Sequence, residues 1–266
     1  YASIASIKFS ATFVDSLKKI FNRENSINIL KNNHTCDYKG FGSYINFQKI
    51  NYNRDNRSFG LKDVSLLIEK GSNIALIGES GSGKSTFLDI VSGLVSPDSG
   101  DFLVDGILLD HKARVEWEKE VSYASQDVNV FDGTVSENIA FGISKGDIDM
   151  DRVIRVSKIA CLHDFIDKEM ADKYDTNLGD SGVFISGGQR QRIGIARSLY
   201  RYPELLILDE ATSALDGLTE RKILDNLNSI SNLTIIRVIH GKSTLKFSDK
   251  VYQIKDGRLS QIDKLI

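Results

Sequence analysis

Two glycine-rich stretches of the sequence contain the residue types that hold phosphate groups. The first, GESGSGKST at residues 78–86, follows the apolar run NIALI and has the pattern Gly-x-x-x-x-Gly-Lys-Ser. In this strand, loop and helix context, glycines turn the backbone N–H groups towards a phosphate, and the helix N-terminus adds a favourable dipole. Lys84 would then reach the β- and γ-phosphates, and the Ser85 hydroxyl would bind Mg²⁺. The predicted nucleotide-binding residues here are Gly78, Glu79, Ser80, Gly81, Ser82, Gly83, Lys84, Ser85 and Thr86.

Two acids follow a second apolar run, in the stretch ELLILDEATSALD. In phosphoryl transfer, an acid at the end of a buried strand holds Mg²⁺, often through water, and a second carboxylate polarises the attacking water. Asp209 and Glu210 occupy these two places. Taken alone, the stretch also fits a strand that ends in a solvated acidic turn. Together with the phosphate loop, it predicts a Mg-nucleotide hydrolase.

The second glycine-rich stretch, ISGGQRQR at residues 185–192, lies at the start of another helix-like run. At the start of this helix, a hydroxyl, backbone amides and the helix dipole would all point the same way. The residues concerned are Ser186, Gly187 and Gly188, and Gln189 begins the helix. A glycine-rich helix cap without a ligand is the alternative for these residues alone. The stretch therefore predicts a second phosphate-binding loop in a chain that already has one.

The elements that position these loops read as an α/β fold. NIALIG and ELLILDE are unbroken apolar runs, which are typical of parallel strands buried on both faces. SYINFQKINY alternates as a half-buried strand does, and VSLLIEKGSNIALIG predicts two strands around a turn. Residues from about 130 to 197 are poor in strand signals. This region predicts a helical subdomain inserted in the α/β core.

The first 40 residues differ in pattern from the rest. Apolar residues at helical spacing over residues 3–21 predict an amphipathic helix, and the polar stretch after it predicts a linker. We therefore divide the chain into residues 1–40 and a domain over residues 41–266. The helix either packs on its own domain or connects it to another one, and the first residue, Tyr1, is consistent with a fragment of a longer protein.

Composition excludes several other classes. With a net charge of −2 and a pI of about 6.1, the chain lacks the basic character of a nucleic-acid binder, so no nucleic-acid partner is predicted. Cys36 and Cys161 lie far apart without zinc-type spacing, which favours reduced thiols. Apolar runs such as Leu205–Leu208 are too short to span a bilayer.

The stretch ISGGQRQRIGIARSLYRYPELLILDEATSALD resembles the signature motif, Walker B strand and D-loop of ATP-binding cassette (ABC) ATPases, and the resemblance covers residues 44–262. It implies a P-loop NTPase (RecA-like) core with an antiparallel β subdomain and an inserted α-helical subdomain. It also implies ATP and Mg²⁺ as cofactors. In that family two domains pack head to tail, so Ser186 to Gln189 would contact the ATP that another chain's Walker A holds.

The resemblance also assigns roles to individual residues. Glu210 would be the general base and Asp209 the Mg²⁺ anchor. Gln126 matches the Q-loop glutamine, which senses the γ-phosphate and Mg²⁺, and His240 matches the switch histidine that contacts the γ-phosphate. Asp216 matches the D-loop aspartate at the dimer interface.

Two further stretches resemble the exporter branch of the family, namely DGTVSENIAFG and TNLGDSG, with Asp180 in the acidic position of the latter. The resemblance implies a bacterial exporter with a transmembrane domain in the same native chain, placed at the cytoplasmic face of the plasma membrane. The N-terminal segment would be the remnant of that connection. The second ATPase domain would come from a homodimer or a heterodimer, with the homodimer favoured; both the Glu210 site and the signature are intact, which permits two active sites.

Some positions depart from the family pattern. The adenine-stacking position of the A-loop falls on Arg54 by spacing, while the aromatic Tyr52 lies two residues earlier, so either residue would contact the base. Ile185 replaces the usual leucine of the signature, and Gly241 follows His240 where arginine is common. A soluble ABC ATPase acting on ribosomes or DNA and an importer subunit are the alternative functions. The single cassette, the charge and the exporter-like stretches argue against both, and the sequence does not name a transported molecule.

Overall fold

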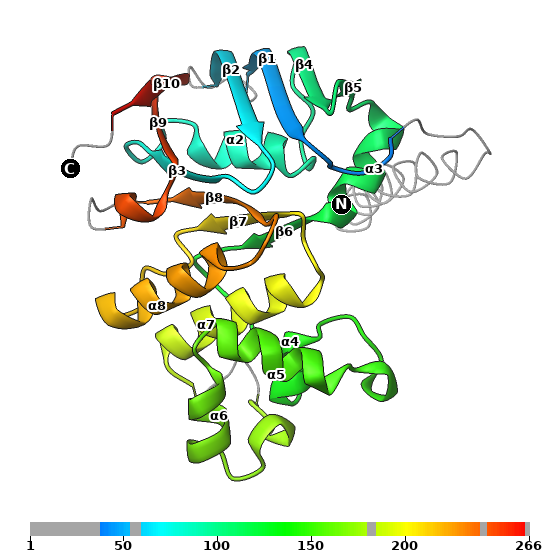
Figure 1. The fold of residues 1–266 in the computed structure, drawn as a ribbon, viewed down its shortest axis with the longest axis vertical. Helices are drawn as coiled ribbons and strands as arrows, with labels where there is room; N and C mark the ends of the chain where they lie inside the picture. The colour runs from blue at the N-terminus through cyan, green and yellow to red at the C-terminus, as the bar shows by residue number, and fades with distance from the viewer. Residues whose placement is uncertain (1–37, 54–59, 180–184, 240–243, 264–266) are drawn as a thin grey trace, which may run out of the picture. The chain divides into compact units, whose positions relative to one another are not determined.

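The computed structural model describes residues 38–53, 60–179, 185–239 and 244–263. The chain divides between Asp37 and Tyr38, and the unit from Tyr38 onwards is the one described here (Figure 1). The predicted N-terminal amphipathic helix lies outside the described residues. The assignment of residues 1–40 as a connecting segment therefore stays a prediction.

A four-stranded antiparallel sheet forms one layer of this unit. Its strand order is β2-β1-β4-β5. The strands are β1 (Tyr44–Tyr52), β2 (Leu61–Glu69), β4 (Ser99–Val104) and β5 (Ile107–Leu108). In β2 the residues Val64, Leu66 and Ile68 are buried, and the residues between them are exposed. This period of two buries one face of the sheet, as predicted for the antiparallel β subdomain.

A six-stranded sheet carries the loops predicted to bind nucleotide. Its order is β10-β9-β3-β8-β7-β6, and only β10 runs antiparallel to its neighbour. The strands are β3 (Asn73–Ile77), β6 (Val121–Ala124), β7 (Leu205–Asp209), β8 (Thr234–Val238), β9 (Lys250–Lys255) and β10 (Arg258–Ile262). The first four residues of β3 and of β7 are all buried, which confirms that these runs are internal parallel strands.

Helix α2 (Lys84–Val91) lies between the two sheets (Figure 1). Its Phe87 packs edge-on against Phe47 of β1, with ring centroids 5.4 Å apart. Trp117 of α3 (His111–Glu120) is fully buried and donates its indole N–H to the carbonyl of Val91 at 2.8 Å. This aromatic core fixes the helix that follows the phosphate loop.

The remaining helices lie on the other side of the six-stranded sheet (Figure 1). They are α4 (Val135–Ile139), α5 (Met150–Ile159), α6 (His163–Glu169), α7 (Gly187–Tyr200) and α8 (Gly217–Asn228). Short 3₁₀ helices are η1 (Lys145–Asp147), η2 (Lys173–Asp175) and η4 (Leu245–Phe247). No helix among the described residues is long and apolar enough to cross a membrane.

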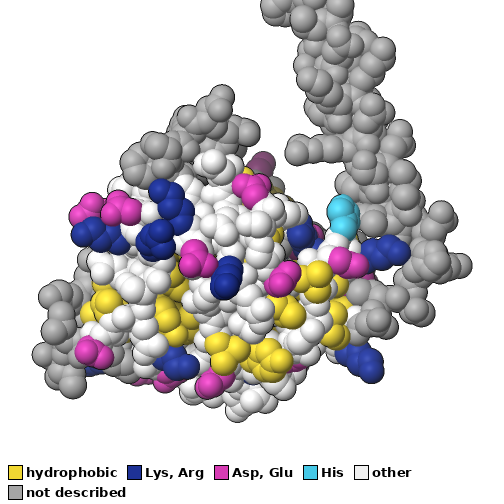
Figure 2. Space-filling model, turned by 90° about the horizontal axis from the view of Figure 1, so that it is seen from above, with side chains coloured by type: hydrophobic (Ala, Val, Ile, Leu, Met, Phe, Trp, Pro, Cys, Tyr) yellow, Lys and Arg dark blue, Asp and Glu magenta, His cyan; other side chains and the backbone are white. Residues whose placement is uncertain are grey.

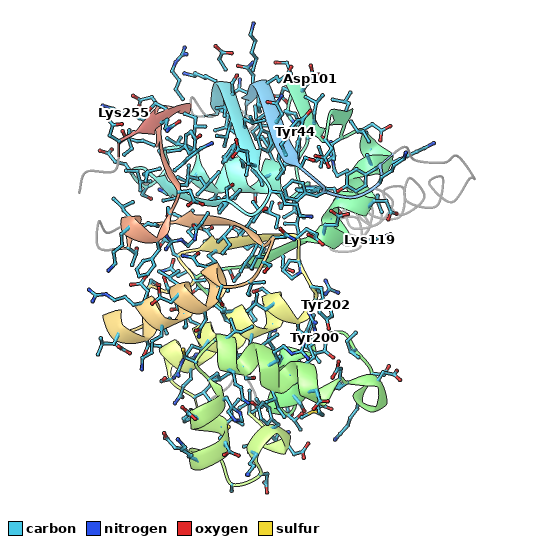
Figure 3. The ribbon with its side chains drawn as sticks, in the orientation of Figure 1. Tyr44, Asp101, Lys119, Tyr200, Tyr202 and Lys255 are labelled. Carbon is cyan, nitrogen blue, oxygen red and sulfur yellow. The ribbon has the colours of Figure 1, made fainter. Side chains whose placement is uncertain are left out.

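Buried polar side chains attach α7 to the rest of the helical part. Arg152 of α5 is buried and donates to the carbonyls of Leu199 and Tyr200 in the last turn of α7. The Tyr200 hydroxyl accepts from the backbone N–H of Asp149 at 3.0 Å, and Figure 3 shows Tyr200 at this end of the helix. The last carbonyl groups of an α-helix have no donors within the helix, and Arg152 supplies donors and a positive charge to those of α7.

Asn138 organises the turn that leads into α4. Its side chain is fully buried and donates to the carbonyls of Phe131, Gly133 and Thr134 at 3.1, 3.4 and 3.1 Å. Its carbonyl oxygen accepts from the backbone N–H of Phe131 and from Arg197, both at 3.2 Å. One amide therefore holds the turn closed and joins it to α7.

Two carboxylates fix the point where the chain enters the unit. Glu120 accepts hydrogen bonds from the Tyr38 hydroxyl and from the Phe41 N–H, both at 2.9 Å. Asp105 accepts from the backbone N–H groups of residues 42–44, where β1 begins with Tyr44 (Figure 3). The chain is thus tied to the β4–β5 turn and to the end of α3 before the first strand starts.

Charges of both signs are mixed on the surface shown in Figure 2. Basic and acidic side chains lie next to each other there, with small apolar groups between them. The described residues on that face form no large patch of one sign. This distribution agrees with the small net charge of −2.

We predict that Asn138→Leu lowers the free energy of unfolding by about 2–4 kcal/mol, because leucine keeps the volume but leaves buried backbone groups without partners. Urea unfolding followed by circular dichroism measures this effect. Asn129→Leu is the control, since the Asn129 side chain is exposed and its replacement should change stability by less than about 0.5 kcal/mol. Equal stability of the two variants would contradict the role of Asn138.

Candidate nucleotide-binding site

The predicted site residues follow the carboxyl ends of neighbouring parallel strands. Strand β3 leads into Gly78, β6 into Gln126, and β7 ends at Asp209. The register places Val238 of β8 opposite both Leu76 of β3 and Asp209 of β7. Because parallel strands end on one edge of their sheet, the structure brings the phosphate loop, the two acids and the glutamine to the same edge.

The phosphate loop has a geometry that suits a phosphate group. Gly83 precedes α2 with a φ of 110°, which favours glycine, and no side chain caps the first turn of the helix. Lys84 is buried, and its ammonium donates to the carbonyls of Gly78 and Glu79 at 2.8 and 2.9 Å. The hydroxyl of Ser82 is buried and has no hydrogen-bond partner among the described residues. The loop thus offers helix N–H groups, a cation and a hydroxyl that lacks a partner.

The hairpin of β9 and β10 lies directly against this loop. The N–H of Gly257 donates to the carbonyl of Ser82 at 3.3 Å. A Cβ atom at Gly78 would come within 2.4 Å of the carbonyl oxygen of Ile254, so the strand leaves no room for a side chain there. The curvature of the loop is therefore fixed from outside by a hairpin that sequence analysis did not predict.

Asp209 and Glu210 lie together at the end of β7. Asp209 accepts a hydrogen bond from the Tyr123 hydroxyl at 2.6 Å, with Tyr123 on the adjacent strand β6. Glu210 has a φ of 54°, a backbone conformation that L-residues adopt at a cost. This conformation turns the chain away from the strand direction directly after Asp209. Asp209 is thus the last residue of β7, and Glu210 is the first residue of the segment that follows the strand.

A cavity of about 280 Å³ adjoins Glu210. Its polar lining comes from Glu210, Thr212, Ser213, Glu220, Arg237 and Thr244. Arg237 of β8 is buried and donates to Asn73, to Ser248 and to the carbonyl of Thr244. Burial lowers the pKa of Arg237 to about 10, so the side chain stays cationic at neutral pH. The cavity behind Glu210 therefore contains a fixed positive charge.

The second glycine-rich stretch forms the start of α7. Ser186 is the N-cap: its hydroxyl accepts from the Gln189 N–H at 3.2 Å, and the Gln189 side chain accepts from the Ser186 N–H at 2.7 Å. This capping box uses the hydroxyl as an acceptor and leaves its proton available for another acceptor. Gly187 is exposed, and a Cβ atom at Gly188 would lie 3.1 Å from the carbonyl oxygen of Ala214.

Gln191 is a site residue that sequence analysis missed. It is buried in α7, and its amide nitrogen donates to Ser213 Oγ at 3.0 Å and to the carbonyl of Gln126 at 3.4 Å. Its oxygen accepts from the Ala214 N–H at 2.8 Å. One amide thus joins the signature helix to the segment after Glu210 and to Gln126. Its position two residues after Gln189 gave no signal beyond the helical pattern.

Other predicted residues take separate positions. The Gln126 side chain is exposed just after β6. Asp216 is the N-cap of α8, and hydrogen bonds from Thr219 and Leu218 hold the pKa of its carboxyl below the usual value. Tyr52 lies at the end of β1, half-buried and paired with Leu61. Arg54, Asp180, His240 and Gly241 lie outside the described residues.

The described residues suit a magnesium ion that is held together with a nucleotide. They contain no group of three or more His, Cys, Asp or Glu side chains that could hold a metal by themselves. Mg²⁺ commonly binds through one or two carboxylates together with substrate phosphates and waters. Asp209, Ser85 and Gln126 are the oxygen donors that the site offers for that purpose.

Comparison with known proteins gives the family. The sequence profile described as "ABC transporter" matches residues 61–213, which contain the phosphate loop, the start of α7 and both acids. The chain belongs to the ABC transporter family. The α/β fold and the ATPase class predicted from sequence are thereby confirmed, and the family implies that the domain binds ATP.

Several relatives are similar over most of this chain. The heterocyst differentiation ATP-binding protein HepA of Nostoc sp. is 36% identical over 97% of the chain, which covers 43% of HepA. An ATP-dependent lipid A-core flippase of Cupriavidus metallidurans is 39% identical over 76% of the chain, which covers 34% of that protein. The ATP-bound structure of a bacterial Atm1-family ABC exporter superposes with a TM-score of 0.76 at 32% identity, covering 84% of this chain and 39% of that one. The chain spans less than half the length of each of these proteins.

We predict that Lys84→Ala lowers the affinity for ATP at least about tenfold, because the phosphates lose a cationic donor. Titration with a fluorescent ATP analogue measures the dissociation constant. Lys112→Ala, which removes an exposed lysine of α3, is the control and should bind as the wild type does. Unchanged affinity in Lys84→Ala would contradict the assignment of the phosphate loop.

Proposed function

We propose that this chain is the ATP-hydrolysing domain of a bacterial exporter and powers transport by closing and opening a dimer of two such domains. The single observation that carries this proposal is the separation of two glycine-rich helix starts, which would be the two halves of one kind of site. The phosphate loop precedes α2 on one side of the six-stranded sheet, and the start of α7 lies on the other side (Figure 1). One chain therefore presents each half to a different nucleotide.

A head-to-tail dimer completes both halves. The Ser186 hydroxyl, whose proton is not used by the capping box, and the exposed Gly187 would contact the γ-phosphate of an ATP held by the partner domain. Asp216, exposed at the start of α8, would lie at the same interface. A homodimer contains two such sites because each chain has both halves.

Within each site, Glu210 would accept a proton from the attacking water, and His240 would orient the γ-phosphate. Asp209, Ser85 and Gln126 would hold Mg²⁺, which neutralises charge on the phosphate oxygens when it is bound. When ATP binds, the Lys84 ammonium would break its hydrogen bonds to the carbonyls of Gly78 and Glu79 and would contact the β- and γ-phosphates instead. Tyr52 or Arg54 would stack on the adenine.

The longer relatives support a membrane partner. An ATP-dependent lipid A-core flippase and an Atm1-family exporter align over most of this chain, yet the chain covers only 34% and 39% of their lengths. We therefore infer that a transmembrane domain belongs to the same native protein, joined through residues 1–40. The domain would then work at the cytoplasmic face of the plasma membrane, with substrate choice determined by the transmembrane part.

We predict that Glu210→Gln lowers ATP turnover at least about a hundredfold while leaving ATP binding intact, because the base is lost and the binding groups remain. The variant should elute as a dimer in Mg-ATP during size-exclusion chromatography and as a monomer without nucleotide. Glu116→Gln, which changes an exposed carboxylate paired with Lys119, should hydrolyse ATP as the wild type does. Turnover at the wild-type rate in Glu210→Gln would refute the assignment.

A further inference from the structure

A tyrosine contacts the carboxylate that the proposed function assigns to Mg²⁺. The Tyr123 hydroxyl lies 2.6 Å from Asp209 Oδ2, a distance typical of a short hydrogen bond to a charged oxygen. A carboxylate has no proton to give at neutral pH, so the phenol is the donor. Neither the phosphate loop nor the signature motif includes this residue.

The sheet register explains why this contact forms. Tyr123 of β6 lies opposite Ile207 of β7, and Asp209 follows Ile207 by two residues. Side chains two residues apart point to the same face of a strand, and diagonal neighbours are within reach of a long aromatic side chain. The phenol therefore reaches along the sheet to the carboxylate at the strand end.

We propose that Tyr123 is a positioning residue for the magnesium ion, holding Asp209 Oδ2 so that the other carboxylate oxygen faces the metal or its water. This role rests on the proposed function. Strand β6 ends at Ala124, and the chain reaches Gln126, a second proposed magnesium ligand, two residues later. The Tyr123 hydrogen bond therefore ties the strand that precedes Gln126 to the carboxylate at the end of β7.

Hydrogen bonds to metal-binding carboxylates commonly change metal affinity by about 10- to 100-fold. Tyr123→Phe retains the ring and removes only the hydroxyl, so packing between β6 and the helices is kept. We expect this variant to bind the metal about tenfold more weakly in the presence of nucleotide. Its affinity for nucleotide without metal should stay unchanged.

The matched control is Tyr38→Phe. It removes a hydroxyl that also donates to a carboxylate, Glu120, at 2.9 Å, where α3 ends. The two variants therefore remove the same chemical group, and only one of them touches a proposed metal ligand.

The experiment measures Mn²⁺, as a paramagnetic substitute for Mg²⁺, by electron paramagnetic resonance in the presence of a non-hydrolysable ATP analogue. The expected result is a dissociation constant for Mn²⁺ raised about tenfold in Tyr123→Phe and unchanged in Tyr38→Phe. In ATPase assays, Tyr123→Phe should need correspondingly more Mg²⁺ for half-maximal rate and should approach the wild-type rate when Mg²⁺ saturates.

Equal Mn²⁺ affinity in Tyr123→Phe and wild type would overturn the positioning role and leave the proposed function standing. A rate loss that saturating Mg²⁺ does not restore would also overturn it, since the tyrosine would then act on another step. Absence of nucleotide-dependent Mn²⁺ binding in the wild type would refute the Mg-ATP function itself, and this role with it.

Discussion

The first turn of an α-helix has N–H groups that the helix cannot satisfy, and the two halves of the proposed site meet this constraint in opposite ways. Helix α2 starts after Gly83, and no side chain caps it. Helix α7 starts with Ser186 and Gln189, which cap each other. The start of α2 thus has no cap from its own side chains, whereas the start of α7 is capped by its own residues. A glycine-rich helix start can therefore leave its N–H groups uncapped and open to a ligand, or it can be capped by its own side chains. The capping residues distinguish the two cases.

The rest of the fold holds these helix starts in place. Helix α2 packs on the four-stranded sheet through the contact between Phe47 and Phe87, while the β9–β10 hairpin lies against the phosphate loop from outside. On the other side, Gln191 links α7 to the segment after Glu210. One buried amide therefore holds that segment against the helix that begins with Ser186. Binding groups and supporting groups lie on the same few elements.

Much of this arrangement could be predicted from the residues alone. NIALI and LLILD are apolar throughout because parallel strands are buried on both faces, and the glycine pattern located the phosphate loop directly. The helical region was recognisable because it lacks strand signals. Tyr123 and Gln191 could not be found in this way, since their contacts depend on strand register and on helix position relative to loops. The hairpin of β9 and β10 was also missed, because short strands at the end of a chain have little periodicity.

The way in which the chain enters this unit has a mechanical consequence. Tyr38 and Phe41 are bound to Glu120, and the N–H groups at the start of β1 are bound to Asp105. These carboxylates lie in two different elements, the β4–β5 turn and the end of α3. A force applied at residue 38 therefore acts on several hydrogen bonds at once. It does not separate β1 from its sheet one hydrogen bond at a time. Unravelling of β1 from its N-terminal end therefore requires these side-chain hydrogen bonds to break as well.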